Sequence, residues 1–195
     1  MALTTTPAGR PRDSQIDEAV LRATVDLLER DGYLQLTIAN IAERAGTTKP
    51  AIYRRWPTKA HLVREAVFPA QDFAGTPAGR KLRTDFHALV HVALELLGRP
   101  AARAALPGLL AEAAADASLA AEVLGRAASG TLEWLRDRLE AGVTAGEVRP
   151  GVSATTVFQL VAGAAFVATA TGGADAVHGE WIDDVVELIV RGIAP

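Results

Sequence analysis

Residues 36–62 constrain the fold of this chain more than any other segment, because their spacing fits two short helices joined at a sharp turn. Thr37 is a favourable N-cap for the first helix. Gly46 suits a backbone position with positive φ, which ends that helix. The apolar residues between them share one helix face and are Ile38, Ile41, Ala42 and Ala45. The sequence therefore predicts a short amphipathic helix that stops at a glycine turn.

A second short helix is predicted directly after the turn. Thr48 caps it, and Pro50 lies in its first turn, where the missing N–H costs nothing. Ile52 and Trp56 are four residues apart and point toward the first helix. The remaining side chains are small, basic or phenolic and face outward or to the flanks: Lys49, Pro50, Ala51, Tyr53, Arg54 and Arg55. A helix with this apolar back and basic front suits a DNA major groove, so the segment is predicted to be a helix-turn-helix.

The predicted DNA contacts fall into two kinds. Arg54 and Arg55 are expected to contact base edges. Phosphates are expected to bind Thr37, Lys49, Tyr53 and Lys59. Lys59 follows the N-cap Thr58 of the next helix and so would lie beside the recognition helix. Thr48, Pro50 and Ala51 complete the predicted DNA-binding surface.

The alternative is a buried helical hairpin whose basic face is merely solvated. The charge pattern disfavours it, because residues 44–64 contain six Arg or Lys and no Asp or Glu. The chain as a whole has a net charge of −3, but residues 1–70 are net +2 and residues 71–195 are net −5. A basic end on an acidic remainder fits DNA binding through that end alone.

The same segment resembles the N-terminal signature of TetR-family transcriptional regulators, over about residues 16–67. The matching pattern comprises Thr37, Ile41, Ala42, Ala45, Gly46, Ile52, Tyr53, Arg54, Arg55, Trp56, Lys59 and Leu62. Two residues depart from it: Trp56, where phenylalanine is commoner, and Thr47, where valine is frequent. The resemblance implies dimerisation through the last two helices and a small-molecule cavity in the C-terminal domain.

The remainder of the chain shows helical periodicity and no strand alternation, so we predict an all-α fold of about nine helices. Residues 1–12 are expected to be a disordered arm, residues 13–68 the DNA-binding domain, residues 69–77 a linker and residues 78–195 the effector-binding and dimerisation domain. The first helix should end at Asp31-Gly32, after which Tyr33 and Leu34 return the chain to its buried stripe. A kink or break is expected at Pro107-Gly108.

The last two helices, about residues 153–171 and 179–193, are apolar over more surface than one neighbour can bury. We predict that they form half of a four-helix bundle between two chains. The predicted interface residues are Val157, Val161, Ala164, Ala168, Trp181, Val185, Leu188 and Ile189. A central core helix in a monomer is the alternative, and the family resemblance favours the dimer.

Catalytic and metal-binding patterns are weak. There is no cysteine, no glycine-rich phosphate loop and no G-x-S-x-G motif, so no enzyme activity and no cofactor are expected. His87 and His91 have the spacing of a metal-binding pair but no evident third ligand, so no metal is expected either. Residues 1–12 have no apolar core of a signal peptide, and residues 152–167 are interrupted by polar side chains, so a cytoplasmic protein is expected.

The resemblance implies an effector site, for which large apolar side chains are the candidates, although each is more often ordinary core. The candidate residues are Phe86, His87, Val90, Leu110, Trp134, Phe158, Phe166 and Thr169, with Leu89, Leu135 and Thr131 beside them. Such a lining favours an apolar effector. The chain is thus predicted to be a ligand-responsive regulator, most simply a repressor that binds a palindromic DNA operator as a homodimer. The alternatives are an activator or an architectural DNA-binding protein, or a helical ligand-binding or enzymatic protein whose helix-turn-helix is only structural.

Overall fold

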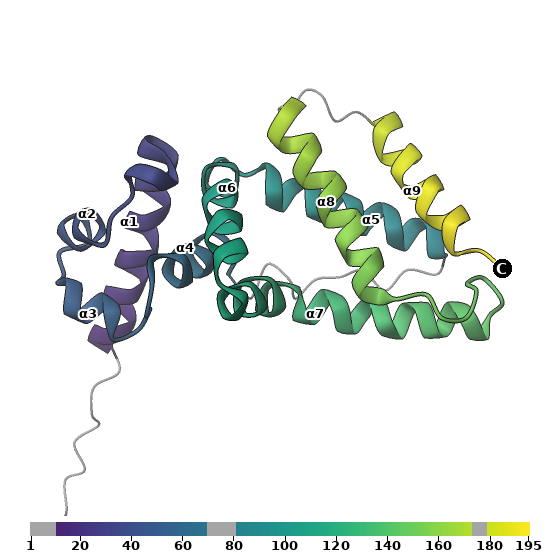
Figure 1. The fold of residues 1–195 in the computed structure, drawn as a ribbon, viewed down its shortest axis with the longest axis horizontal. Helices are drawn as coiled ribbons and strands as arrows, with labels where there is room; N and C mark the ends of the chain where they lie inside the picture. The colour runs from purple at the N-terminus through teal and green to yellow at the C-terminus, as the bar shows by residue number, and fades with distance from the viewer. Residues whose placement is uncertain (1–10, 70–80, 173–178) are drawn as a thin grey trace, which may run out of the picture.

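The computed structural model describes residues 11–69, 81–172 and 179–195 of the chain, and within these ranges it contains nine helices and no strand (Figure 1). The helices are α1 (Pro11–Gln35), α2 (Ile38–Arg44), α3 (Lys49–Tyr53), α4 (Lys59–Val67), α5 (Leu82–Gly98), α6 (Pro100–Ala115), α7 (Ala117–Thr144), α8 (Ala154–Gly172) and α9 (Gly179–Ile193). The predicted all-α class is confirmed. We call residues 11–69 the head and the remaining described residues the body. Residues 1–10 of the predicted arm and residues 70–77 of the predicted linker lie outside the described residues.

Helix α1 is interrupted where the sequence predicts its end. Gly32 has φ 76° and ψ 172°, a conformation that only glycine adopts without strain, and one more helical turn follows. Tyr33 is buried by this change of direction, as predicted. Leu34 is not: it is 88% exposed, because the next turn directs it to solvent while Tyr33 and Leu36 occupy the core.

The core of the head extends into the body. Apolar side chains of α1 to α4 form one cluster, which also contains Leu96 of α5 and Ala101, Ala102, Ala105 and Leu109 of α6. Helix α6 packs on both α1 and α4. It is continuous through Pro107, so the predicted interruption there does not split it. The head and α6 therefore share one core, and α6 is the part of the body that contacts the head most extensively.

A second core lies between α5, α7, α8 and α9. At one end of it, buried Asp85 of α5 accepts a hydrogen bond from Arg138 Nε of α7 at 2.5 Å. Arg138 also reaches Glu147 in the turn before α8, at 3.3 Å. The next residues of that turn bind the end of α9, because Arg149 N donates to Ile193 O at 2.8 Å. Polar contacts thus hold α5, α7, α9 and the turn before α8 together at the end of the body farthest from the head.

Helix α8 is the one described helix that is long and apolar enough to cross a membrane by length and composition. Its segment Ala154–Thr171 has a mean hydropathy of 1.5, yet only 28% of the segment is buried within the chain. Much of its apolar surface therefore lacks cover from this chain.

Candidate nucleic-acid interface

The predicted turn is present in the structure. Thr37 has an extended backbone, and its hydroxyl accepts a hydrogen bond from Asn40 N at 3.2 Å, as expected for an N-cap of α2. Gly46 has φ 65°, and the following Thr47 N donates to Ala42 O at 2.9 Å. Thr47, where the resemblance departs from the usual valine, thus takes part in the turn through its backbone.

Helix α3 is held from behind by buried aromatic and aliphatic side chains. Thr48 caps it, accepting from Ala51 N at 3.4 Å, and Ile52 and Trp56 are buried. The indole Nε1 of Trp56 donates to Glu65 Oε2 of α4 at 3.1 Å. Trp56 is therefore packed in the head core, and its indole joins the segment after α3 to α4.

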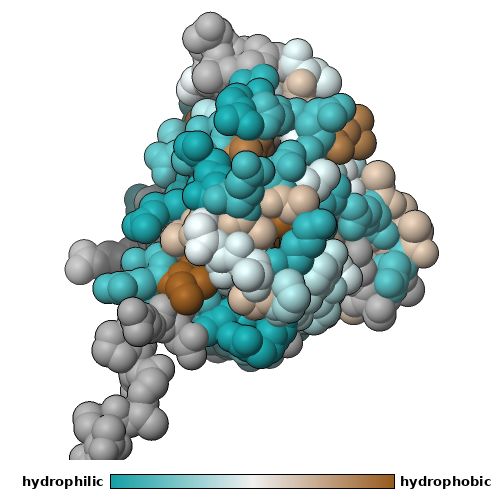
Figure 2. All heavy atoms as spheres, turned by 90° about the vertical axis from the view of Figure 1, so that its left-hand side faces the viewer, coloured by the Kyte–Doolittle hydropathy of each residue, from teal (hydrophilic) through white to brown (hydrophobic). Residues whose placement is uncertain are grey.

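The front of α3 is open to solvent. Thr48, Lys49, Pro50, Tyr53 and Arg54 are exposed, Tyr53 by 50%. In Figure 1, α2 and α3 form the end of the molecule opposite α9. Figure 2, which views this end from outside, shows a largely hydrophilic surface with isolated apolar side chains. Thr37, at the start of α2, is exposed as well. The predicted DNA-binding residues are thus mostly accessible from one end.

Two of the predicted contact residues are engaged within the chain. Arg55 forms an ion pair with Asp17 of α1, and both side chains are largely covered. This guanidinium fastens α3 to α1 and does not extend from the front of the helix, which differs from its predicted role at base edges. Helical periodicity predicted that Arg55 lies on a flank of the helix. It could not predict the pairing with Asp17, which is 38 residues earlier in the sequence.

Lys59 is also turned inward. Its Nζ lies 3.9 Å from the centroid of the Tyr33 ring, donates to Tyr33 O at 3.2 Å and lies 3.8 Å from Glu112 Oε1 of α6. The predicted phosphate contact would therefore require the ammonium group to leave these three partners. Glu112 is far away in the sequence, so the sequence offered no sign of this arrangement.

Tyr33 of the head and Gly108 of α6 lie close together. A Cβ atom placed on Gly108 would lie 2.1 Å from Cδ1 and 2.4 Å from Cγ of the Tyr33 ring. Burial raises the pKa of Tyr33 well above its ordinary value, and the neighbouring Glu112 carboxylate raises it further. The phenol therefore stays neutral in any physiological solution. We call Tyr33, Lys59, Gly108 and Glu112 the α6 joint.

Comparison with known proteins identifies the family. Residues 20–66 match the model described as "Bacterial regulatory proteins, tetR family", and residues 76–189 match "Tetracyclin repressor-like, C-terminal domain". The chain belongs to the TetR family. Members of this family are transcriptional regulators with a DNA-binding and a ligand-binding domain, and the resemblance in residues 16–67 is thereby confirmed.

Several relatives of this TetR-family chain are named as transcriptional regulators. It is 28% identical over 187 residues to the uncharacterized HTH-type transcriptional regulator YdeS of Bacillus subtilis (strain 168), covering 95% of this chain and 93% of YdeS. The solved TetR-family transcription regulator SCO0332 has a TM-score of 0.68 at 24% identity, covering 93% and 100% of the two chains. The regulator FadR from Bacillus subtilis, solved in complex with stearoyl-CoA, has a TM-score of 0.65 at 19% identity, covering 90% and 98%. At these identities the solved structures show the fold.

Some of the predicted effector residues of this TetR-family chain line two hollows in the body. Leu110 and Phe158, with Leu89 and Thr131, line a cavity of about 140 Å³ between α5, α6, α7 and α8, which we call the inner cavity. Phe166 and Thr169 line a pocket of about 420 Å³ beside Arg103 and Pro107, which we call the outer pocket.

The other predicted effector residues line neither hollow. Phe86 and Val90 are fully packed in the second core, and Trp134 packs against it. His87 Nε2 lies 3.1 Å from Asp183 Oδ1 of α9. Periodicity identified these side chains as inward-facing, but it could not show which of them meet a neighbour and which face open space. Among the described residues no cluster of three potential metal ligands is found.

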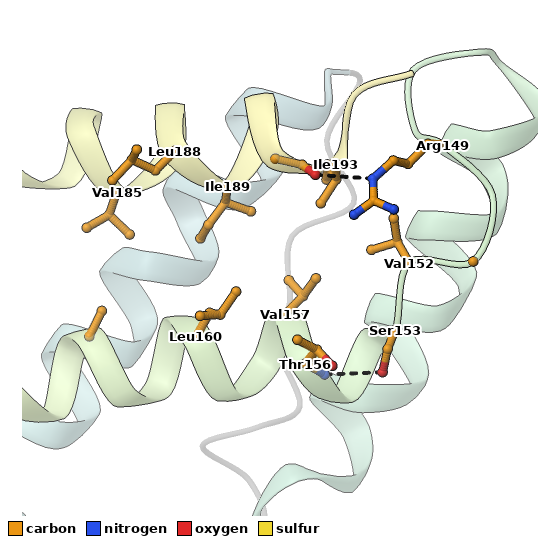
Figure 3. A pocket seen from close by; sticks show the side chains of 13 residues that line it. Arg149, Val152, Ser153, Thr156, Val157, Leu160, Val185, Leu188, Ile189 and Ile193 are labelled. Carbon is orange, nitrogen blue, oxygen red and sulfur yellow. Dashed lines mark hydrogen bonds between the residues drawn. The ribbon is translucent and has the colours of Figure 1, made fainter.

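The predicted dimer residues also divide between two faces. Val157, Val161 and Ile189 are buried within the chain, whereas Ala164, Ala168, Trp181 and Val185 are partly exposed. The most exposed apolar side chains of α8 and α9 are Leu160, Val167 and Leu188. An apolar groove of about 490 Å³ separates the two helices, and Figure 3 shows Leu160 and Val157 of α8 pointing toward Val185 and Ile189 of α9 across it. Leu160 and Val167 were missed by the residue prediction, because a helix that is apolar all round gives no indication of which side is outermost.

Proposed function

We propose that this TetR-family chain is a ligand-responsive repressor, which binds a palindromic operator as a homodimer and releases it when a small molecule enters the body. The observation that supports this most is the exposed front of α3, which lies at the opposite end of the molecule from an uncovered apolar groove. A protein of this form can bind a second copy with one end and DNA with the other. Its place would be the cytoplasm, on nucleoid DNA.

On the DNA side, Arg54 is the side chain placed to select bases. It is exposed at the end of α3, and no ion pair holds it among the described residues. Thr37, Lys49 and Tyr53 are also exposed and would bind phosphates, which fixes the register of α3 in the groove. Two such heads related by a two-fold axis would contact half-sites about 34 Å apart, or a multiple of that distance.

On the dimer side, α8 and α9 present apolar surface that needs cover. Leu160 is 58% exposed and Leu188 is 74% exposed, on either side of the groove. A second copy would cover both helices with the same surface, as a two-fold dimer requires. A membrane is the other environment that could accept α8, but its exposed Thr155, Thr156 and Gln159 are poorly suited to lipid.

Release by an effector would act through α6. This helix lines both the inner cavity and the outer pocket, and it also packs against α1 and α4 of the head. Phe68, directly after α4, lines the inner cavity as well. A ligand that fits only a displaced α6 would therefore favour a different spacing of the two heads. It could shift that equilibrium only by its difference in affinity for the two states.

The DNA-binding proposal is tested by selecting operator fragments from a random pool and measuring affinity for the selected and a scrambled sequence. We expect Arg54→Ala to lose about 1–3 kcal/mol of discrimination between the two sequences, while dimerisation is unchanged. Arg136→Ala is the matched control, because Arg136 is an exposed arginine on α7, in the body. Equal discrimination by Arg54→Ala and the wild type would contradict the proposed role. Protection of an asymmetric single site would contradict the palindrome.

The dimer is tested by sedimentation of Leu188→Glu and Leu34→Glu. Both leucines are highly exposed, but Leu34 lies in the head and Leu188 on the groove. We expect Leu188→Glu to be monomeric at micromolar concentration, because a second copy would bury the new carboxylate without a partner. Leu34→Glu should sediment like the wild type. A dimeric Leu188→Glu would count against the α8–α9 interface, and a monomeric wild type would count against the dimer itself.

A further inference from the structure

The inner cavity and the outer pocket are adjacent. Leu97 of α5 and Leu106 of α6 line both, so the two hollows meet at these side chains. Their chemistry differs. Among the residues described for the inner cavity, Thr131 supplies the one hydroxyl and the rest are apolar. The outer pocket includes Arg103, the one charged side chain described in the lining of either hollow.

The Thr131 hydroxyl favours a ligand that places a polar atom in the inner cavity. The residue is only 8% exposed, and its hydroxyl is the one polar side-chain group among the residues described for the inner cavity. A ligand oxygen or nitrogen beside this hydroxyl would form a hydrogen bond in otherwise apolar surroundings. Thr169 in the outer pocket does not offer this, because its hydroxyl already donates to Ala165 O at 2.9 Å.

Arg103 favours a ligand that carries a negative charge at the end that lies in the outer pocket. It is exposed on α6 and makes no ion pair within the described ranges, unlike Arg55, Arg83 and Arg138. The lining described for the outer pocket contains no carboxylate that would compete with an anion. A guanidinium is well suited to a carboxylate, which it can bind through two parallel hydrogen bonds.

We infer that the two hollows form one site for an amphipathic monoanion, that is, an aliphatic or aryl-aliphatic carboxylic acid. Its carboxylate binds Arg103, its apolar part passes between Leu97 and Leu106, and an oxygen or unsaturated edge within reach of Thr131 completes the fit. A nucleotide thioester is disfavoured, because the polyphosphate of such a ligand would need several basic groups where the described lining supplies one. A sugar is disfavoured by the small number of polar groups in the inner cavity.

This inference names the effector class and so rests on the proposed function for its biological meaning, but ligand binding can be measured without DNA. Isothermal titration of the full chain with straight-chain carboxylates from hexanoate to myristate gives the binding series. Decanol and decanoyl-CoA serve as comparison ligands of the same chain length. We expect one or more carboxylates to bind, and decanoate to bind at least about tenfold more tightly than decanol.

The variants separate the two ends of the site. Arg103→Gln should weaken binding of the carboxylates about tenfold and leave binding of decanol unchanged. Thr131→Val should weaken binding of 10-hydroxydecanoate, which adds an oxygen at the far end of the chain, and leave binding of decanoate unchanged. Arg136→Gln, on α7, is the matched control and should change neither. The far-ultraviolet circular dichroism of each variant shows whether it is folded.

Three results would overturn the inference: no carboxylate binding at any concentration below micelle formation, equal binding of decanol and decanoate, or unchanged carboxylate binding by folded Arg103→Gln. Tighter binding of decanoyl-CoA than of decanoate would also overturn it. The DNA arm is read separately, by titrating the bound acid into an operator complex. If the acid binds through Arg103 but the operator stays bound, the proposed ligand class is supported and the proposed release of DNA by this ligand is contradicted. If another compound releases the operator while no acid binds, release by a ligand is supported and the proposed ligand class is contradicted.

Discussion

Gly108→Ala tests whether the α6 joint matters for stability. The new Cβ would lie 2.1 Å from Cδ1 of Tyr33 and 2.6 Å from Cε1. The ring is buried and cannot move aside as the end of a flexible chain could, so the helix or the ring must shift. Overpacking of this kind costs about 1–3 kcal/mol, and the short distances place this site at the upper end. Alanine returns about 1 kcal/mol through its higher helix propensity. We expect a net loss of about 2 kcal/mol.

The measurement is urea unfolding at a fixed protomer concentration, since a dimer makes apparent stability depend on concentration. The control is a double-mutant cycle with Tyr33→Ala, which removes the ring that the Cβ would meet. In that background Gly108→Ala should be neutral or slightly stabilising, because only the helix-propensity gain remains. The reasoning would be refuted if Gly108→Ala were as stable as the wild type, or if it cost the same with and without Tyr33.

Three further predictions concern the body and the DNA-binding face. Asp85→Ala should cost about 3 kcal/mol in urea unfolding, because it leaves Arg138 largely buried with Glu147 as its remaining described partner, and Asp85→Ala/Arg138→Met should recover most of the loss. Arg83 and Arg191 lower the pKa of Glu187 below its ordinary value, so its contribution to stability is present above that ordinary value and is lost as the pH falls through the lower folded pKa. Glu187→Gln should therefore flatten the acid side of the stability profile, and an unchanged profile would count against these ion pairs. Lys49→Ala should weaken operator binding equally across sequences and reduce the salt slope by about 2 per dimer, and an unaltered slope would remove Lys49 from the phosphate contacts.

The parts of the fold that depend on residues close together in the sequence were predictable. Caps and turns are local chemistry, so Thr37, Gly46 and Thr48 occupy their predicted positions. The apolar backs of α2 and α3 follow from helical spacing alone. The long-range pairs were not predictable, because helical spacing cannot relate a side chain to a carboxylate on a distant helix. Arg55 with Asp17 and Lys59 with Glu112 are examples.

The candidate sites of the body were predictable only as a set of inward-facing residues. Phe86 and Phe166 look alike in the sequence, yet one is fully packed and the other lines the outer pocket. The difference depends on how closely the facing helices approach, which is set by three-dimensional packing. The same limit applied to α8, where Val161 and Leu160 are adjacent but only Val161 is buried by the chain itself.

The contact between Tyr33 and Gly108 limits how the DNA-binding domain of this chain could be combined with the sensor domain of another regulator. A residue larger than glycine at position 108 is expected to cost stability unless a smaller one stands at position 33, although the two positions belong to different domains. A chimera that grafts this DNA-binding end onto another regulator's sensor would therefore pack correctly only if it also brought a matching α6. The two domains differ in what they bind, but the close fit between Tyr33 and Gly108 means that a change in one requires a matching change in the other.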